Sequence, residues 1–439
     1  MHWKIIYKRE VINMDEKITY LSRLIEDSIT TSMKTNGCVV IQGPKWCGKS
    51  TTAERFVKTI IKLQKPAIYN QYKILSDIGD ENLLSGEKPL LFDEWQKIPE
   101  LWDYIRSFID EVSGKGLFVL TGSAKPIEDN KRHTGTGRIK IIVMRTMSLW
   151  ESKESSGEVS LKSLFDKSAK ISGKNKYQLK DIAYIICRGG FPSAVVEKDK
   201  DIALNYVKDY VDTLVTADIT NVDDINRNPN RARAILRSYA RNVSTPAKMT
   251  TILKDIEANV DVQDVRTVDS YLSAFSKLFV IEETTSWTPK LRSKTTIRTT
   301  SIKHFIDPSI ATAILDATPN DLMSDLNTFG LLFENLVIRD LKIYSQSLEG
   351  IVYNYHDSSG LEADAIIHLK DGRWALIEVK IGGEKLINEG AEALKKIADK
   401  INLEKMNKPS FMAIITASDS FAYKREDGVY VIPIACLRP

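Results

Sequence analysis

The chain has 439 residues, so we expect about three domains, because a single domain usually holds roughly 100–200 residues. Hydrophobic residues make up 43% and charged residues 27% of the chain, which is typical of an ordinary soluble protein. No apolar run approaches the roughly 20 residues needed to cross a bilayer, so no membrane-spanning helix is expected. The net charge of +4 is too small to indicate nucleic-acid binding, so any basic surface has to be local.

The cysteines and the N-terminus indicate the cellular compartment in which the protein is expected. Four scattered cysteines without a CxxC pair, and only 5 histidines, argue against a zinc site or a disulfide framework. The first 13 residues are basic but lack the apolar core of a signal peptide. We therefore expect a cytoplasmic protein without a membrane partner, whose translation starts at Met1 or at Met14.

A nucleotide-binding pattern begins at residue 37. Residues 38–41 are an apolar run typical of a buried parallel strand, and residues 43–50 then match G-x-x-x-x-G-K-[ST]. Such a loop places backbone N–H groups around phosphates at the positive end of a helix. A helix through residue 61 is predicted by the apolar positions Ala53, Phe56, Val57, Ile60 and Ile61. We expect ATP with Mg²⁺ to contact Gly43, Pro44, Lys45, Trp46, Cys47, Gly48, Lys49, Ser50 and Thr51.

Polar and charged residues at the end of this loop and at the end of a later strand are expected to take part in ATP hydrolysis. Lys49 would reach the β- and γ-phosphates, and Ser50 would ligate Mg²⁺. The segment K-P-L-L-F-D-E-W reads as a buried strand that ends in Asp93 and Glu94. Asp93 is placed to hold the Mg²⁺ of the nucleotide, while Glu94 can polarise the attacking water.

Two further polar positions follow. A third buried strand ends in T-G-S, where Ser123 can sense the γ-phosphate. Arg138 comes just before another strand and could stabilise transition-state charge, in cis or on a neighbouring subunit. The alternative for Arg138 is a solvated charge at the rim of the sheet.

This order of phosphate loop, Asp-Glu strand, T-G-S strand and G-R pair resembles the AAA-type ATPases. More narrowly, it resembles the bacterial and archaeal ATP-binding proteins that join such a domain to a poorly characterised C-terminal half. The resemblance implies an α/β fold with a P-loop parallel sheet over residues 14–150. The segment R-T-M-S-L-W-E-S departs from the proline-leucine-serine run of that family. The resemblance therefore does not fix the end of the ATPase domain near residue 150.

Residues 151–310 are expected to hold a linker and a helical, winged-helix-like domain. Residues 151–176 are rich in Ser, Lys and Glu and are predicted to be an exposed excursion. Gly189 and Gly190 precede Pro192 as in the G-G-aromatic-P turn of the same family, or simply form a tight turn between helices. Helices are predicted over 230–242 and from residue 264 into a strand near 280.

A basic hairpin is predicted over residues 286–304, where Thr and Ile alternate among basic side chains without an acid. A basic wing beside a basic helix can hold a DNA backbone through phosphate contacts. Charge runs are also commonly solvated faces, and such folds also serve as packing units between domains. The candidate DNA contacts are Lys290, Arg292, Lys294 and Arg298.

Residues 311–439 show the element order α-β-β-α-β, with Asp364 on the first strand and Glu378 and Lys380 at the end of the second. This order resembles the PD-(D/E)XK fold, a small α/β restriction-endonuclease-like domain. The resemblance implies that Asp364 and Glu378 hold Mg²⁺, that Lys380 orients or deprotonates water, and that Glu334 supports the metal from the preceding helix. The competing interpretation is a solvated polar rim on two ordinary strands.

The turn between these strands tests the nuclease hypothesis. A two-residue turn at Asp371 and Gly372 would put Asp364 and Glu378 on opposite faces of the sheet. A three-residue loop, 370–372 with Gly372 left-handed, would put Asp364 directly across from Glu378, with Lys380 on the same face. Aspartate-glycine suits either turn, so the nuclease interpretation requires the odd-length loop or a compensating bulge.

Two functions are compatible with these patterns. The first is an ATP-binding and ATP-hydrolysing protein that acts on DNA and carries a metal-dependent nuclease domain. The second is an ATP-gated regulatory or toxin–antitoxin-type protein, in which an inactive nuclease-like domain binds a protein partner. The sequence predicts no oligomeric state.

Overall fold

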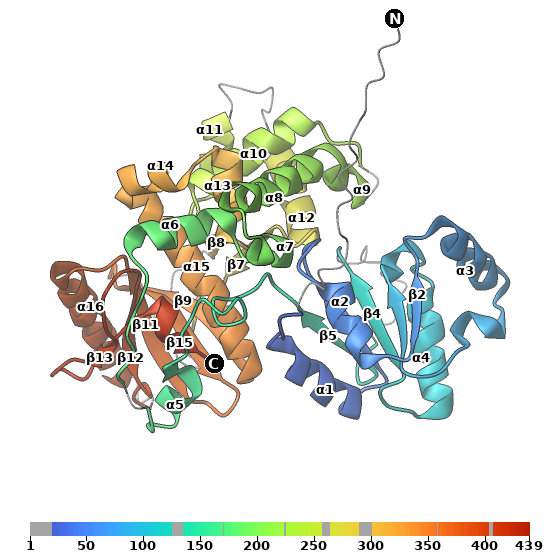
Figure 1. Ribbon diagram of the computed structural model, residues 1–439, viewed down its shortest axis with the longest axis horizontal. Coiled ribbons are helices and arrows are strands. Elements are labelled where there is room, and N and C mark those ends of the chain that lie inside the picture. Colours follow the sequence, from blue (N-terminus) through green and yellow to red (C-terminus); the bar gives the residue numbers. More distant parts are fainter. Residues whose placement is uncertain are drawn as a thin grey trace, which may run out of the picture.

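The computed structural model describes residues 20–124, 135–169, 171–223, 225–256, 264–288, 301–357, 359–403 and 407–439. Figure 1 shows the first sheet, in blue and cyan, on one side of the molecule and the C-terminal sheet, in orange and red, on the other. Helices from the middle of the chain lie above and between them. Within the described residues, no helix combines the length and hydropathy of a membrane span.

The N-terminal sheet is parallel and has the strand order β2-β3-β4-β1-β5. Its three central strands are completely buried, because helices cover both faces and leave no room for polar alternation. The strands are β1 (Cys38–Gln42), β2 (Thr59–Lys62), β3 (Leu90–Asp93), β4 (Phe118–Gly122) and β5 (Ile139–Val143). The helices are α1 (Ile25–Thr35), α2 (Lys49–Ala53), α3 (Pro66–Ile78) and α4 (Leu101–Val112).

The helix after the phosphate loop is shorter than predicted. α2 ends at Ala53 and is followed by one 3₁₀ turn, Glu54–Phe56, and then by strand β2, which contains Ile60 and Ile61. The prediction of a helix through residue 61 is therefore wrong. Thr59, Ile60 and Ile61 are β-branched in succession, a composition that favours a strand, and they pair with β3.

The middle region is mainly helical. Its helices α10, α11 and α12 contact one another and lead into the antiparallel hairpin β7–β8. The helices are α6 (Leu179–Arg188), α7 (Pro192–Val196), α8 (Lys200–Thr213), α9 (Ile219–Asn221), α10 (Pro229–Arg241), α11 (Met249–Ile256), α12 (Val265–Lys277), α13 (Pro308–Leu315) and α14 (Pro319–Ser324). A π-helical turn, Leu214–Asp218, joins α8 to α9, and the hairpin strands are β7 (Ile281–Thr284) and β8 (Ile302–Phe305).

The segment predicted to be an exposed excursion is partly buried against the C-terminal domain. Strand β6 (Val159–Ser160) pairs in parallel with β15 (Leu437–Arg438), and α5 (Leu161–Phe165) buries Leu161, Leu164 and Phe165. The prediction of full exposure is wrong here, because its Ser and Lys residues flank apolar positions that one short helix gathers on one side.

The C-terminal domain is a six-stranded mixed sheet, β13-β14-β12-β11-β10-β9. α16 and the middle of the sheet share one apolar cluster, while α15 packs on the core that continues into the middle region. The strands are β9 (Gly350–His356), β10 (Glu362–Leu369), β11 (Trp374–Lys380), β12 (Met412–Thr416), β13 (Tyr423–Lys424) and β14 (Tyr430–Pro433). The helices are α15 (Leu326–Ser347) and α16 (Glu384–Leu403).

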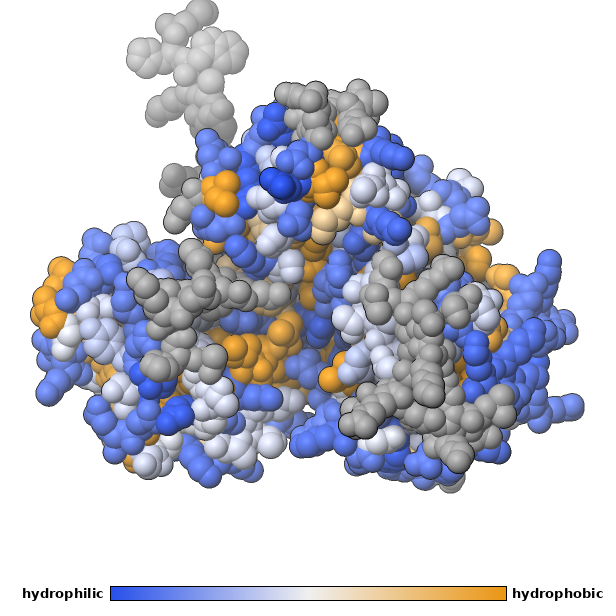
Figure 2. Space-filling model, turned by 180° about the vertical axis from the view of Figure 1, so that it is seen from behind, coloured by the Kyte–Doolittle hydropathy of each residue, from blue (hydrophilic) through white to orange (hydrophobic). Residues whose placement is uncertain are grey.

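A groove separates the two outer domains. Seen from behind, both are covered largely by hydrophilic residues, with a hollow between them below the middle region (Figure 2). Residues of α1, β5, α15 and β9 line a groove of about 1120 Å³, among them Lys140, Ile141, Lys342 and Ile351. Partly buried ion pairs nevertheless tie the domains together, since Arg145 lies 2.8 Å from Glu282, which also pairs with Lys342 at 3.2 Å.

Candidate functional site

The phosphate loop lies between the end of β1 and the start of α2, at the carboxyl end of the parallel sheet. A side chain at Gly43 would collide with the Met144 carbonyl oxygen, 2.0 Å from the Cβ position. Gly48, at the first turn of α2, has a φ of 96°, a left-handed conformation that favours glycine. Lys49 is buried, and its Nζ donates to the carbonyl oxygen of Pro44 at 2.8 Å, inside the loop that would enclose the phosphates.

Ser50 and Asp93 meet at the position predicted for Mg²⁺. The Ser50 hydroxyl donates to Oδ1 of Asp93 at 2.6 Å. Thr121 also donates to Oδ1, and Gln64 Nε2 donates to Oδ2 at 2.8 Å. Asp93 is fully buried at the end of β3, so these donors fix its carboxylate toward the phosphate loop.

Glu94 sits on a strained turn beside them. Its φ of 60° and ψ of 48° are left-handed, which is uncommon for a residue with a side chain. Its Oε2 accepts hydrogen bonds from Ser123 Oγ at 2.9 Å and from Gln96 Nε2. The structure therefore brings Ser123 and Glu94 into contact at the tips of adjacent strands, a contact that the sequence analysis did not predict, with Gln96 as a second partner.

Arg138 lies at the opposite end of the sheet. Its carbonyl accepts from the amide of Cys38, at the amino end of β1, whereas ligands in such sheets bind at the carboxyl ends. Its half-exposed side chain pairs with Asp110 of α4. Arg138 is therefore about a strand length away from the phosphate loop of its own chain, because it precedes its strand. Its action on the nucleotide of a neighbouring subunit stays a prediction.

Arg23 is a residue of this region that the sequence patterns missed. It is buried, and its guanidinium donates to the Cys47 carbonyl at 2.7 Å and to the Arg145 carbonyl at 2.8 Å, and pairs with Glu151 at 3.1 Å. Arg23 thus joins the phosphate loop to the segment that leaves β5. No local pattern signals this role, because its partners are 24 to 128 residues away in the sequence.

The β10–β11 hairpin has the register that the nuclease hypothesis requires. Ala365 pairs with Ile377 and His368 with Trp374, which places Asp364 across from Glu378. Gly372 has a φ of 87°, and the Leu369 amide donates to the Arg373 carbonyl at 2.8 Å, which closes a three-residue loop. The predicted odd-length turn is confirmed.

Four of the predicted residues come together at the ends of these strands. Lys380 Nζ lies 2.7 Å from Oε1 of Glu378, and Asp364 Oδ2 accepts from the Val379 amide at 2.7 Å. Burial and the charges of Asp364 and Glu378 raise the pKa of Glu334, which α15 contributes. Burial, followed by the charge of Asp364, raises the pKa of Glu378 to about 8.

The buried Oε2 of Glu378 has no hydrogen-bond partner. A buried carboxylate oxygen without a partner is costly and calls for an explanation, such as an ion. Yet no set of three His, Cys, Asp or Glu residues in the described part of the chain is close enough to hold a metal ion. The donors have the oxygen chemistry that Mg²⁺ prefers, but their carboxylates are turned toward Lys380 and Val379 instead of a common point.

His304 was not among the predicted residues. It is buried on β8, its Nδ1 lies 2.9 Å from Thr284 Oγ1, and its Nε2 lies 3.6 Å from Glu334 Oε1. Burial lowers its pKa to about 3, so the imidazole is neutral at pH 7. A lone histidine in a basic hairpin gave no signal of this contact.

The candidate DNA contacts Lys290, Arg292, Lys294 and Arg298 lie outside the described residues.

Three family models match successive parts of the chain. Residues 35–153 match an AAA domain, residues 179–321 a domain of unknown function (DUF8612), and residues 329–437 another domain of unknown function (DUF4143). Among the curated proteins, none matches the chain.

Several solved structures are similar at low identity. A Walker-type ATPase of Pyrococcus abyssi has 14% identity and a TM-score of 0.43 over 67% of this chain and 96% of its own. The Orc1 protein of Aeropyrum pernix, in complex with DNA, has 10% identity and a TM-score of 0.27 over 71% and 95%. A signal-transduction ATPase with a tetratricopeptide repeat sensor, from Pyrococcus horikoshii, has 14% identity and a TM-score of 0.25 over 75% and 49%.

The match to an AAA domain covers β1 to β5, the phosphate loop and the Asp93–Glu94 turn. The matches to the two domains of unknown function cover most of the middle region and of the C-terminal sheet. The chain therefore carries an AAA domain of the ATP-binding type, followed by a helical middle region and a C-terminal mixed-sheet domain.

Proposed function

We propose that the chain hydrolyses ATP at the carboxyl end of the N-terminal sheet. The observation that carries this proposal is the buried contact of Asp93 with Ser50, directly before Glu94. Lys49 binds the β- and γ-phosphates, and Ser50 and Asp93 hold Mg²⁺ through a hydroxyl and a carboxylate oxygen. When bound, Mg²⁺ neutralises charge that develops on the transferred phosphoryl group.

Glu94 orients the water that attacks the γ-phosphorus and accepts its proton as the bond to the β-phosphate oxygen breaks, giving ADP and phosphate. Both Ser123 and Gln96 donate to Oε2 of Glu94, so Oε1 is the oxygen available to accept the proton of the water. Ser123 and Gln96 therefore position the carboxylate of the base.

Glu94→Gln tests this proposal in the full chain. The substitution keeps the size and hydrogen bonding of the side chain but removes the base, so turnover should fall by about 10²–10⁴-fold. ATP affinity, measured by calorimetry, should stay within a few-fold of wild type. Glu111→Gln, at an exposed position of α4, is the matched control and should change neither. Turnover unchanged by Glu94→Gln would rule out Glu94 as the base.

A second candidate activity belongs to the C-terminal domain, namely metal-dependent cleavage of a phosphodiester. The observation that favours it is the unpartnered Oε2 of Glu378 beside Asp364, Glu334 and Lys380. Asp364 and Glu378 would hold Mg²⁺, which would neutralise phosphate charge, while Lys380 would orient the attacking water. DNA is the proposed substrate, with Lys290, Arg292, Lys294 and Arg298 as backbone contacts.

Nicking of supercoiled plasmid with Mg²⁺ or Mn²⁺, with and without ATP, tests this second activity. Cleavage should be lost in Lys380→Ala and kept in Lys370→Ala, an exposed lysine at the turn of the same hairpin. A further variant, Lys49→Ala, shows whether ATP gates the cleavage. Absence of nicking by a protein that hydrolyses ATP would favour the alternative, a nuclease-like domain that binds a protein partner under ATP control.

A further inference from the structure

An ion pair joins the phosphate loop to the middle region. Lys45 Nζ donates to Oδ1 of Asp218 at 2.6 Å. Lys45 belongs to residues 43–50, which match the phosphate-binding pattern, whereas Asp218 lies in the region that matches DUF8612. A carboxylate from another part of the chain therefore holds a cation of the candidate nucleotide site, and the hydrolysis proposed above gives Asp218 no role.

Asp218 is nearly buried, so its charge needs a partner inside the protein. Its side chain is 9% exposed, and it is the last residue of the π-helical turn Leu214–Asp218. Such turns are rare and often lie at functional sites. A carboxylate in this position is costly unless a cation compensates its charge, and among the described residues Lys45 is the cation paired with it. Any group that takes Lys45 away from Asp218 therefore destabilises this turn.

The tip of the phosphate loop is held toward the same helices. Trp46, the residue after Lys45, has a φ of 63°, a left-handed conformation that is uncommon for a residue with a side chain. The centre of its ring lies 5.9 Å from that of Tyr210 in α8. The Lys45 side chain is 44% exposed and carries three N–H donors on a flexible stem. The backbone of the loop is thus held against the middle region, while its ammonium group can change partner.

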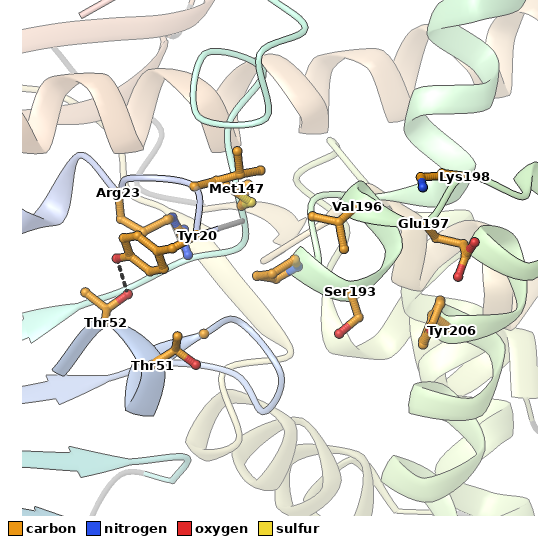
Figure 3. Close-up of a pocket in the computed structure, with 13 residues that line it drawn as sticks. Tyr20, Arg23, Thr51, Thr52, Met147, Ser193, Val196, Glu197, Lys198 and Tyr206 are labelled. Carbon is orange, nitrogen blue, oxygen red and sulfur yellow. Dashed lines mark hydrogen bonds between the residues drawn. The ribbon is translucent and has the colours of Figure 1, made fainter. Parts of the chain in front are cut away.

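Beside this ion pair, the loop and the middle region are separated by open space. A cavity of about 510 Å³ has Thr51 and Thr52 on one side and Ser193 and Val196 on the other. Figure 3 shows Thr51 facing Ser193 and Val196 across this space. A change of partner at Lys45 can therefore move the π-helical turn relative to the loop without a clash on this side.

We propose that Asp218 competes with the phosphates of the nucleotide for Lys45 and so lowers the affinity of the loop. Without nucleotide, the carboxylate neutralises Lys45. When nucleotide binds, the phosphate oxygens, which carry more negative charge, take the ammonium group, and Asp218 is left without its cation. By linkage, the free energy that Asp218 takes from nucleotide binding is also lost from the π-helical turn. This inference rests on the proposed nucleotide site and adds a residue that sets its affinity.

Asp218→Asn tests the inference, because it keeps the shape of the side chain and removes the competing charge. Calorimetry on the full chain measures binding of the β,γ-imido analogue of ATP with Mg²⁺, so the result does not depend on turnover. We expect the analogue to bind Asp218→Asn at least about fivefold more tightly than wild type. Asp212→Asn, which alters an exposed carboxylate of α8, is the matched control and should bind like wild type.

A double-mutant cycle separates competition from direct repulsion. Competition requires Lys45, so in a Lys45→Met background Asp218→Asn should change the affinity by less than about twofold. Direct repulsion between Asp218 and the phosphates would tighten binding equally in both backgrounds, which would overturn the inference. Affinity that is unchanged or reduced in Asp218→Asn also overturns it, because the carboxylate then supports the loop.

Hydrogen exchange of the wild-type protein adds a test that needs no substitution. Binding of the analogue should speed exchange of the backbone amides of residues 214–218, because the turn loses its ion pair. In Asp218→Asn, binding should leave their exchange unchanged. Exchange that is unchanged or slower in the wild-type protein overturns the inference.

The binding measurements also separate this inference from the proposed hydrolysis. Absence of binding by wild type and Asp218→Asn alike overturns the inference and the proposed function together. Tighter binding by Asp218→Asn that depends on Lys45, in a protein without ATP turnover, supports the inference and contradicts only the hydrolysis proposal.

Discussion

The phosphate-loop site and the C-terminal carboxylate cluster differ in how their polar groups are satisfied. Lys49, Ser50, Asp93 and Glu94 each have a hydrogen-bond partner within the site. In the cluster, burial raises the pKa values of Glu334, Asp364 and Glu378, and repulsion by Asp364 adds to the shifts of Glu334 and Glu378. One buried oxygen of Glu378 is unpaired. The first site is organised before its ligand arrives, whereas the second is held together against its own charges and requires a cation or protons.

Lys49→Ala should have the largest effect and would break the claim that the first site is organised for phosphate. The substitution removes the buried ammonium of the loop, so ATP should bind at least about 100-fold more weakly. Calorimetry with Mg²⁺-ATP measures this loss. The control is Lys58→Ala, an exposed lysine outside the phosphate loop, whose loss should change affinity only a few-fold. Equal losses in the two variants would contradict the assigned role of Lys49.

Arg339→Met tests whether one buried network of ion pairs stabilises the fold that carries both sites. Arg339 of α15 is buried between Asp307 at 2.9 Å and Asp340 at 2.8 Å, and Asp340 also accepts from the Leu149 amide. Its loss leaves two buried carboxylates without a cation, which should destabilise the protein by about 3–5 kcal/mol.

Chemical denaturation measures this change in the free energy of unfolding. Arg233→Met is the matched control, because Arg233 pairs with Asp212 on the surface. Such exposed pairs contribute at most about 1 kcal/mol. A loss in Arg339→Met no larger than in the control would show that the buried network is dispensable.

Burial, together with repulsion by Asp364, raises the pKa of Glu378 and so predicts that stability depends on pH. Because the folded-state pKa of Glu378 is raised to about 8, the folded chain keeps a proton that the unfolded chain has lost between about pH 4.5 and that value. The contribution of Glu378 to stability is therefore present below about pH 4.5 and is lost as the pH rises through about 8. Glu378→Gln removes this titration. Without divalent metal, the free energy of unfolding of the variant should therefore rise relative to that of wild type between pH 5 and pH 9, on the order of a few kcal/mol.

Glu378→Gln also tests whether the carboxylate cluster binds a divalent cation. Mn²⁺ should raise the melting temperature of wild-type protein at pH 8, because a cation relieves the repulsion between Glu378 and Asp364. In Glu378→Gln the increase should be much smaller. If Mn²⁺ stabilises neither protein, the cluster is no metal site and the interpretation as an inactive binding module gains support.

The smallest expected effect concerns the turn that sets the register of the cluster. Gly372→Ala places a side chain at a φ of 87° with open space around it, so only backbone strain opposes it, at about 1–2 kcal/mol. Gly330→Ala, in open space on helix α15, should instead stabilise by up to about 1 kcal/mol. Thermal unfolding compares the two, and a neutral Gly372→Ala would contradict the left-handed turn.

The sequence was most informative where one short pattern determines a local geometry. The phosphate loop and the Asp93–Glu94 strand end each follow from residues adjacent in the chain. The turn at Gly372 does not, because Asp-Gly suits a two-residue or a three-residue loop, and only the register of the hairpin shows the latter. The pairing of Asp364 with Glu378 could be predicted from these two strands alone, given the turn, because side chains alternate along a strand.

The errors arise where tertiary structure overrides a local pattern. Ile60 and Ile61 fit a helical period, but pairing with β3 makes them a strand. Arg138 fits the chain order of a catalytic arginine, but it precedes its strand and so lies far from the phosphate loop of its own chain, which leaves action on a neighbouring subunit as the prediction. Arg23 and His304 were missed, since their contacts join segments that are distant in the sequence.

Single-turnover conversion of bound ATP tests the central claim, that the N-terminal site hydrolyses ATP with Glu94 as the base. Protein in excess is mixed with γ-phosphate-labelled ATP and Mg²⁺, and phosphate formed on the protein is followed with time. We predict that wild-type protein converts its bound ATP, while Glu94→Gln binds the same amount and converts it about 10²–10⁴-fold more slowly. Bound ATP that stays intact on wild-type protein, or equal conversion by both proteins, would contradict this account.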